Sequence, residues 1–252
     1  MNRAATKRVA VVTGGGSGIG LGIARHLAAG HRRVAILDID HEAAGAVADE
    51  LNGEGYEAMP AAVDVSQRAS VEAAMAAVRA ALGPIEILVT SAAITGFAPF
   101  AAITQEAWDR IIAVDLTGTF HCLQAALPDM VEERWGRIVT IASSAGQVGS
   151  PGQGHYSAAK GGVIAMTKTV AREYARFGIT ANTIPPFVVD TPMLRHARAE
   201  GQVPSAEAMA SAIPSGRLGT LDDIGSVGAF LCSEAAGYIT GQVIAANGGA
   251  IV

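Results

Sequence analysis

A chain of 252 residues that is 50% hydrophobic and 16% charged has the length and composition of a globular domain, which excludes a disordered or fibrous protein. A net charge of −5 without a basic tract argues against nucleic acid as a partner. No run approaches the ~18 apolar residues of a membrane span, and the N-terminal apolar run is too short for a signal-peptide core. Cys122 and Cys232, distant in sequence, are typical of reduced thiols. We therefore expect a cytoplasmic protein without a membrane contact or a metal site.

Short β-branched runs alternate with alanine-rich helical segments along the chain. Strands are expected at 8–13, 33–38, 56–63, 86–90, 136–143, 178–184 and 242–247. Helices are expected near 18–30, 41–52, 67–82, 104–133, 155–176 and 221–232. This alternation predicts an α/β fold in a single domain, residues 1–252, with a doubly wound, mainly parallel, Rossmann-type sheet of seven strands. Prolines punctuate residues 185–216, where we expect a lid near 190–214.

The first expected strand runs directly into the glycine-rich segment TGGGSGIG, residues 13–20. Glycines let the backbone turn tightly and approach a ligand closely. The helix that follows presents free N–H groups and a positive dipole end to a pyrophosphate. A glycine-rich turn that binds nothing is the alternative. The pattern favours a dinucleotide site formed by Gly14, Ser17, Gly18, Ile19 and Gly20.

Two aspartates follow the next strands and bear on the identity of the cofactor. Asp38 lies ~20 residues past the glycine loop, where a carboxylate accepts hydrogen bonds from an adenosine ribose and repels a 2′-phosphate. The loop contains no Arg or Lys to attract such a phosphate. Asp64, with Val65 beside it, is expected to meet the adenine. These residues predict NAD as the cofactor, although a solvated aspartate after a strand is the alternative for Asp38.

Three residues carry the expected chemistry. Tyr156 and Lys160 are four apart and share one helix face, and Ser143 ends a strand at the sheet edge where ligands of such folds bind. A free tyrosine, with a pKa of ~10, is a poor base at neutral pH. One positive charge at ~4 Å lowers that pKa by up to ~3 units at an effective dielectric constant of ~20. The alternative is an ordinary helix face, because this spacing is common.

Together, these segments resemble the short-chain dehydrogenase/reductase family over nearly the whole chain. The family pattern T-G-x-x-x-G-x-G matches residues 13–20, and its Ser and Tyr-x-x-x-Lys set matches Ser143, Tyr156 and Lys160. Residues 182–193, 216–225 and 238–249 resemble its nicotinamide-contacting and C-terminal segments. The resemblance implies that Tyr156 is the acid/base, that Lys160 lowers its pKa and holds the ribose, and that Ser143 binds the substrate oxygen. It also implies that the Val189 backbone and the Thr191 side chain hold the carboxamide.

The chain departs from the family pattern at four places, one of which is Asn247 in place of an Asp near the C-terminal end. Where the family has Asn-Asn-Ala-Gly, this chain has TSAA at residues 90–93. The small side chain of Ala92 still allows the cofactor to approach. Other groups must supply the hydrogen bonds that the asparagine side chains make in the family. The fourth catalytic residue, an Asn, corresponds to Asp115. The resemblance assigns its role largely to a main-chain carbonyl that holds a water beside the lysine, and Asp keeps that carbonyl. We expect activity with an altered pH dependence. Phe187 stands where the family has Gly.

These residues and the family resemblance predict an oxidoreductase that transfers a hydride between NAD(H) and a small, mainly apolar secondary alcohol or ketone. One alternative is a 3-oxoacyl-thioester reductase acting on an acyl carrier protein or coenzyme A. Arg195 and Arg198 would then meet the anionic carrier, and a solvated helix face is the alternative for these arginines. The alternative of another class is a catalytically silent nucleotide-binding regulator. A loop histidine without a role is the alternative for His155, and core packing is the alternative for Phe187. The expected substrate contacts are Phe97, Gln147, His155, Phe187 and Met193.

Two long helices bear on assembly. One carries a stripe of apolar residues at spacings of three and four, and the catalytic helix carries small residues that permit close approach. The family resemblance implies that these helices pair across a two-fold axis and that the C-terminal strand forms a second interface, giving a homotetramer. Packing on their own sheet is the alternative. The residues concerned are Leu116, Phe120, Leu123, Leu127, Met130, Gly161, Gly162, Val163, Ala165, Met166 and Val170.

Overall fold

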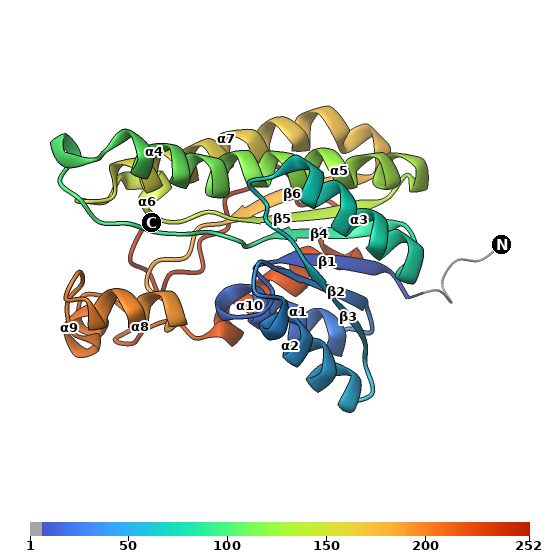
Figure 1. Cartoon of the computed structure of the whole chain (residues 1–252), viewed down its shortest axis with the longest axis horizontal. Coiled ribbons are helices and arrows are strands. Elements are labelled where there is room, and N and C mark those ends of the chain that lie inside the picture. The colour runs from blue at the N-terminus through green and yellow to red at the C-terminus, as the bar shows by residue number, and fades with distance from the viewer. Residues whose placement is uncertain (1–6) are drawn as a thin grey trace.

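The computed structural model describes residues 7–252, so part of the N-terminal segment considered for a signal peptide lies outside the described residues. Six strands form one parallel sheet in the order β3-β2-β1-β4-β5-β6 (Figure 1). The strand order reverses between β1 and β4, and ligands of open α/β sheets bind at that point. The strands are β1 (Val9–Thr13), β2 (Arg33–Asp38), β3 (Glu57–Ala62), β4 (Ile85–Thr90), β5 (Gly136–Ile141) and β6 (Ile179–Ile184).

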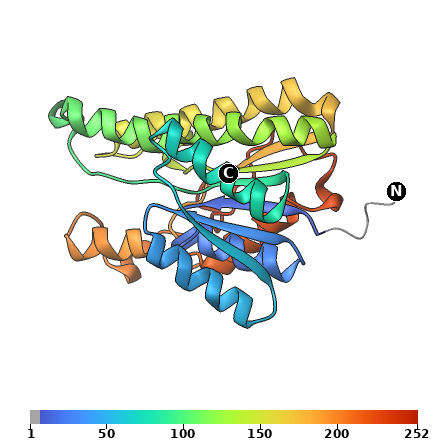
Figure 2. The same ribbon diagram turned by 45° about the vertical axis from the view of Figure 1, so that its right-hand side comes forward.

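Helices cover both faces of the sheet, as Figures 1 and 2 show. One face packs against α1 (Gly18–Ala29), α2 (His41–Gly53) and α10 (Leu221–Leu231). The other packs against α3 (Arg68–Leu82), α5 (Gly118–Glu133) and α7 (Gly154–Tyr174). Every residue of β1, β4, β5 and β6 is therefore buried, including polar ones such as Glu86, Arg137 and Asn182. The doubly wound α/β architecture predicted from the alternation is confirmed.

The seventh expected strand, 242–247, is reduced to a single bridge between Val243 and Thr183 of β6. Around this bridge, side chains take hydrogen bonds that a continuous ladder would use. The Ala181 N–H donates to the Thr240 hydroxyl, and the Gln242 N–H donates to the Asn182 side chain. The predicted seven-stranded sheet thus has six strands and one bridge.

The long helix predicted at 104–133 is divided in the structure. It consists of α4 (Gln105–Ile111), a π-helical segment (Ile112–Thr117) and α5. By length and composition alone, Gln105–Glu133 is long and apolar enough to cross a membrane. Cys122, Leu123 and Met130, however, lie in the core beneath the sheet. The wider π turn contains Asp115, and such turns are frequent at functional sites.

The breaker-rich segment after β6 folds into two short helices that project beyond the carboxyl edge of the sheet (Figure 1). They are α8 (Pro192–Ala199) and α9 (Ala206–Ser211). Thr191 and Ser205 cap them, since their hydroxyls accept the N–H groups of Leu194 and Ala208. A further short helix, α6 (Ala145–Val148), lies between β5 and α7.

Candidate active site

The glycine loop brings the backbone of β1 against the segment after β4. Gly14 has a φ of +64°, and a Cβ there would lie 2.8 Å from the Ala92 backbone. A Cβ on Gly20 would lie 2.1 Å from the Gly14 carbonyl oxygen. Gly20 therefore permits the close packing of α1 on the loop and does not line the cavity, unlike the other loop residues predicted to bind cofactor. The N-terminus of α1 opens at Gly18.

A cavity of about 960 Å³ runs along the carboxyl edge of the sheet. It extends from the glycine loop and the ends of β2 and β3 to Ser143, Tyr156 and the two lid helices. A nicotinamide dinucleotide fits these walls, because the loop that would hold a pyrophosphate is free of bulky side chains and precedes a helix N-terminus. The predicted cofactor residues that line it are Gly14, Ser17, Gly18, Ile19, Asp38, Asp64, Val65, Ala92, Tyr156, Lys160, Val189 and Thr191.

Two carboxylates define the end of the cavity next to β2 and β3. Asp38 is held by the loop, since its Oδ2 accepts the Gly16 N–H at 3.0 Å and its Oδ1 accepts the Asp40 N–H at 3.1 Å. Asp64 is held through Oδ1, which accepts the N–H and the hydroxyl of Ser66 at 3.0 and 2.7 Å. Within residues 7–252, Oδ2 of Asp64 makes no hydrogen bond, so it is free to accept one from a ligand.

The hydroxyl of Thr13 supplies a brace at the point where the family's asparagines are absent. It accepts the N–H groups of Ser91 at 3.2 Å and Ala92 at 3.3 Å. Thr90, the residue opposite Thr13 on β4, has a buried hydroxyl without a hydrogen-bond partner among the described residues. The Thr13 hydroxyl, which is itself part of the glycine-loop pattern, thus holds the start of the segment after β4.

The side chains predicted to be catalytic converge from β5 and α7. Ser143 follows β5, and its Oγ accepts the Ala145 N–H at 3.2 Å. Tyr156 and Lys160 lie in the first turns of α7, with the Lys160 Nζ 5.5 Å from the centroid of the Tyr156 ring. The Nζ also donates to the Ile141 carbonyl at 3.2 Å. A serine hydroxyl, a phenol and an ammonium group at one cavity wall can bind a carbonyl oxygen and exchange a proton with it.

Asp115 lies behind Lys160 and is fully buried. Its Oδ1 accepts the Ile94 N–H at 2.9 Å, and its Oδ2 lies 3.3 Å from the Lys160 Nζ. Its main-chain carbonyl accepts the Thr119 hydroxyl at 2.9 Å. From the sequence we expected a main-chain carbonyl that holds a water beside the lysine and a carboxylate near Lys160, and the structure brings that carboxylate into direct contact with the lysine.

Burial and charge act in opposite directions on these three groups. Burial raises the pKa of the Asp115 carboxyl above its usual value, although the Lys160 ammonium and the Ile94 N–H oppose the shift. Burial lowers the pKa of Lys160, but Asp115 and Tyr156 outweigh this effect and the net shift is upward. Burial raises the pKa of the Tyr156 phenol, and the Asp115 carboxylate also raises it. The Lys160 ammonium and a hydrogen bond with Ser143 lower this pKa, but the net shift is upward.

The far end of the cavity has an apolar wall that includes Phe97, Phe187 and Met193. Phe187 is 37% exposed, so it lines the cavity and does not pack in the core. Two predicted substrate contacts are not brought to the wall. Gln147 lies on α6 with its side chain in solvent. His155 is buried in the first turn of α7, where its Nδ1 accepts the Tyr156 N–H, so it is not a loop histidine.

Several cavity residues escaped the sequence argument because their signal is weak. Gln153 donates to the Thr95 hydroxyl at 2.8 Å and forms a polar pair in the wall. Met209 of α9 lines the cavity. The lid arginines have another place: Arg195 forms two hydrogen bonds to Asp190 at 2.9 Å, and neither it nor Arg198 lines the cavity. The capping signals at Thr191 and Ser205 could have identified the lid helices.

Comparisons with known proteins agree with this geometry. Residues 14–250 match the family model described as enoyl-(acyl carrier protein) reductase. The chain is 37% identical over 242 residues to 3-oxoacyl-[acyl-carrier-protein] reductase FabG of Escherichia coli (strain K12), covering 96% of each protein. It is 36% identical over 245 residues to 2-dehydro-3-deoxy-L-rhamnonate dehydrogenase (NAD(+)) of a Sphingomonas species, covering 96% of this chain and 94% of that protein.

Among solved structures, a variant of actinorhodin polyketide ketoreductase with NADPH superposes with a TM-score of 0.93 at 34% identity, covering 97% of both chains. The fold and the site define an oxidoreductase with a binding site for a nicotinamide cofactor. The chain belongs to the short-chain dehydrogenase/reductase family.

Proposed function

We propose that this protein interconverts a small, mainly apolar secondary alcohol and the corresponding ketone with NAD(H). The observation that carries the proposal is one cavity that joins Ser143, Tyr156 and Lys160 at its catalytic end to Asp38 at its other end. The intact trio argues against the silent regulator, because a protein that only binds nucleotide has no chemical need for all three groups.

Each side chain has a separate role in the proposed reaction. The bound nicotinamide supplies or accepts the hydride. The Ser143 hydroxyl binds the substrate oxygen, and the Tyr156 phenol gives a proton to that oxygen in reduction or takes it in oxidation. Lys160, hydrogen-bonded to the Ile141 carbonyl, places a positive charge beside the phenol. The glycine loop and the α1 N-terminus would hold the pyrophosphate, and Thr191 and the Val189 backbone would hold the carboxamide.

Asp38 supports NAD(H) over NADP(H). Its carboxylate lines the cavity and has lone pairs left to accept hydrogen bonds from a ribose diol. A 2′-phosphate at that place would meet a negative charge, and residues 14–18 contain no cation to balance it. Native enzyme should show a kcat/KM at least ~10-fold higher with NAD(H) than with NADP(H), or ~1.4 kcal/mol. Equal kinetics with the two cofactors would refute this assignment.

The apolar wall of Phe97, Phe187 and Met193 supports a modest hydrophobic substrate. The second candidate is a 3-oxoacyl thioester, which is favoured by the likeness to FabG. The pairing of Arg195 with Asp190 removes one cation that the anionic carrier was expected to use. NADH consumption or production should be screened across alcohols, ketones, hydroxysteroids and acyl thioesters. Turnover confined to acyl thioesters would decide for the second candidate.

We also propose a homotetramer in the cytoplasm, which the two free, buried cysteines suit. Leu123, Leu127 and Met130 of the predicted stripe belong to the chain's own core, which leaves Phe120, 38% exposed, facing outward. At the C-terminal end, Val252 is fully exposed. These apolar groups support interfaces on α5 and on the C-terminal segment.

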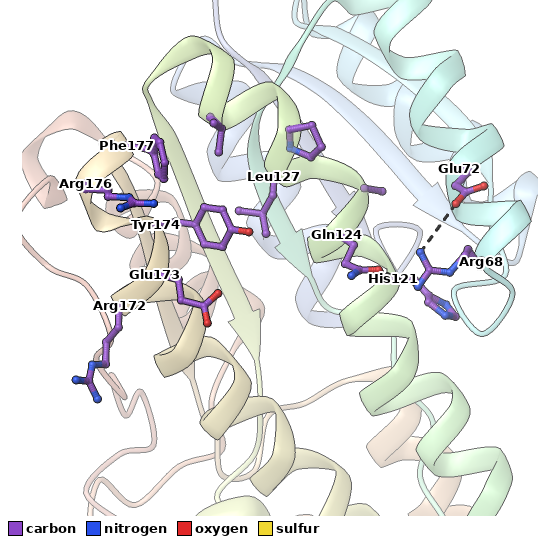
Figure 3. A pocket seen from close by; sticks show the side chains of 13 residues that line it. Arg68, Glu72, His121, Gln124, Leu127, Arg172, Glu173, Tyr174, Arg176 and Phe177 are labelled. Carbon is purple, nitrogen blue, oxygen red and sulfur yellow. Dashed lines mark hydrogen bonds and ion pairs between the residues drawn. The ribbon is translucent and has the colours of Figure 1, made fainter.

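A second cavity, of about 1040 Å³, lies between α3, α5 and the end of α7 (Figure 3). Figure 3 shows Tyr174 and Leu127 at its centre, with Arg68 and Arg172 at its margins. An apolar floor with a charged rim resembles a protein interface, which supports pairing of this face with a second copy. Light scattering that gives the monomer mass of 25.6 kDa at micromolar concentration would refute the tetramer.

A further inference from the structure

The Asp115–Lys160 pair is buried beside the reacting groups. Both side chains are at most 3% exposed, and the carboxylate Oδ2 has no hydrogen-bond partner in the described part of the chain apart from its 3.3 Å contact with the Lys160 Nζ. A charge in such a place is not screened by water, so its field reaches the neighbouring phenol. An uncharged residue at 115 would leave the ammonium unopposed.

Few other groups face the Asp115 carboxylate. The loop after β4 contributes the Ile94 N–H, and α7 contributes Lys160, Tyr156 and His155. Lys160 and His155 both lower the pKa of Asp115, and the effect of Lys160 is the larger. The Lys160 Nζ, 3.3 Å from Oδ2, is the cation in contact with the carboxylate.

We propose that Asp115 is a positioning residue that acts through Lys160 to keep the Tyr156 phenol protonated to higher pH, which sets this site for carbonyl reduction at neutral pH. The proposal rests on the oxidoreductase function proposed above. In reduction, the carbonyl carbon gains the hydride with its electron pair, and the carbonyl oxygen gains the phenol proton, leaving a phenolate. Oxidation runs in reverse and needs that phenolate at the start. A carboxylate near the phenol disfavours the phenolate, so it favours the first direction.

The first test is the pH dependence of Asp115→Asn at saturating cofactor. Asn keeps the acceptor for the Ile94 N–H but removes the charge. In oxidation, kcat/KM rises as Tyr156 loses its proton, and in reduction it falls over the same range. Without the carboxylate, the phenol should ionise at lower pH, so both limbs should move down by about one pH unit.

A second measurement needs no turnover. Tyrosinate absorbance is followed against pH in the protein without cofactor, and the titration of Tyr156→Phe is subtracted to isolate Tyr156. Asp115→Asn should lower the midpoint of this difference titration by about one unit. Asp115→Ala removes the same charge and should move the midpoint in the same direction, which covers the case in which one variant folds poorly.

Glu86→Gln is the matched control. Glu86 lies near the start of β4 at the opposite edge of the sheet, is 8% exposed, and pairs with Arg8. It loses the same charge far from Tyr156, so its titration and pH profile should follow those of the native protein. Titrations of the Asp115 variants that superimpose on the native curve, or shift upward, overturn the proposal even if the enzyme turns over. A downward shift in a protein that reduces no carbonyl substrate would instead overturn the proposed function.

Discussion

The two ends of the cavity use the same functional group in different ways. At the end of β2, the Asp38 carboxylate borders the cavity and is held by backbone N–H groups. Behind the catalytic end, the Asp115 carboxylate is fully buried and faces an ammonium. The first lines the cavity, where a ligand can meet it directly, whereas the second does not line the cavity and could act on a ligand only through Lys160 and Tyr156. Burial thus decides whether a carboxylate selects by contact or tunes by charge.

The largest effect on turnover is expected at the catalytic end, from Tyr156→Phe. Loss of the phenol hydroxyl removes the proton donor while the ring keeps its place in the cavity wall, so turnover should fall below detection. NADH binding, measured by fluorescence, should remain nearly native. A variant that retains more than about a tenth of the native rate would show that another group transfers the proton.

Ser143→Ala tests the next contact at the same end. Removing one donor to the substrate oxygen is expected to lower kcat by ~10²–10³. Steady-state kinetics at saturating cofactor provide the measurement, with the Kd of NADH as the check that the cofactor end is intact. An unchanged kcat would show that Ser143 does not bind the substrate oxygen in the reaction.

Asp38→Ala tests the cofactor end, where a smaller effect is expected. Without the carboxylate, the preference for NAD(H) over NADP(H) should narrow by about 10-fold in kcat/KM, or ~1.4 kcal/mol. Asp40→Ala is a matched control, because Asp40 caps α2 through the Ala43 N–H and does not line the cavity. A preference altered equally by both substitutions would mean that general charge, and not contact at Asp38, sets it.

The smallest effect concerns the brace between the two ends. Thr13→Val leaves the N–H groups of Ser91 and Ala92 without their acceptor side chain and should lower the free energy of unfolding by about 1 kcal/mol. Thr90→Val is the control on the adjacent strand, since that hydroxyl has no partner within residues 7–252 and its loss should be neutral or stabilising. Denaturant unfolding compares the two. Equal destabilisation by both would exclude a specific brace at Thr13.

Local patterns in the sequence were sufficient to predict the sheet, its helices and the position of the candidate site. Apolar runs separated by helical periodicity predicted six strands that the structure contains, because the strands of a sheet covered by helices on both faces are rich in apolar residues. The glycine run predicted a turn before α1, and the placement of Ser143 at a strand end next to the Tyr156–Lys160 helix brought the trio to one cavity. These features depend on near neighbours in the chain or on the common edge of a parallel sheet.

Tertiary packing decided the features that depend on where a side chain points. The contact between Asp115 and Lys160 joins a π-helical turn to α7, and no local pattern specifies which oxygen of residue 115 meets the lysine. Arg195 turned to Asp190 and away from the cavity, and Gln147 turned to solvent. The seventh strand is reduced to one bridge, beside which the side chains of Asn182 and Thr240 accept backbone N–H groups. The spacing of apolar residues does not specify these side-chain contacts, because each depends on which polar group the folded chain places within reach.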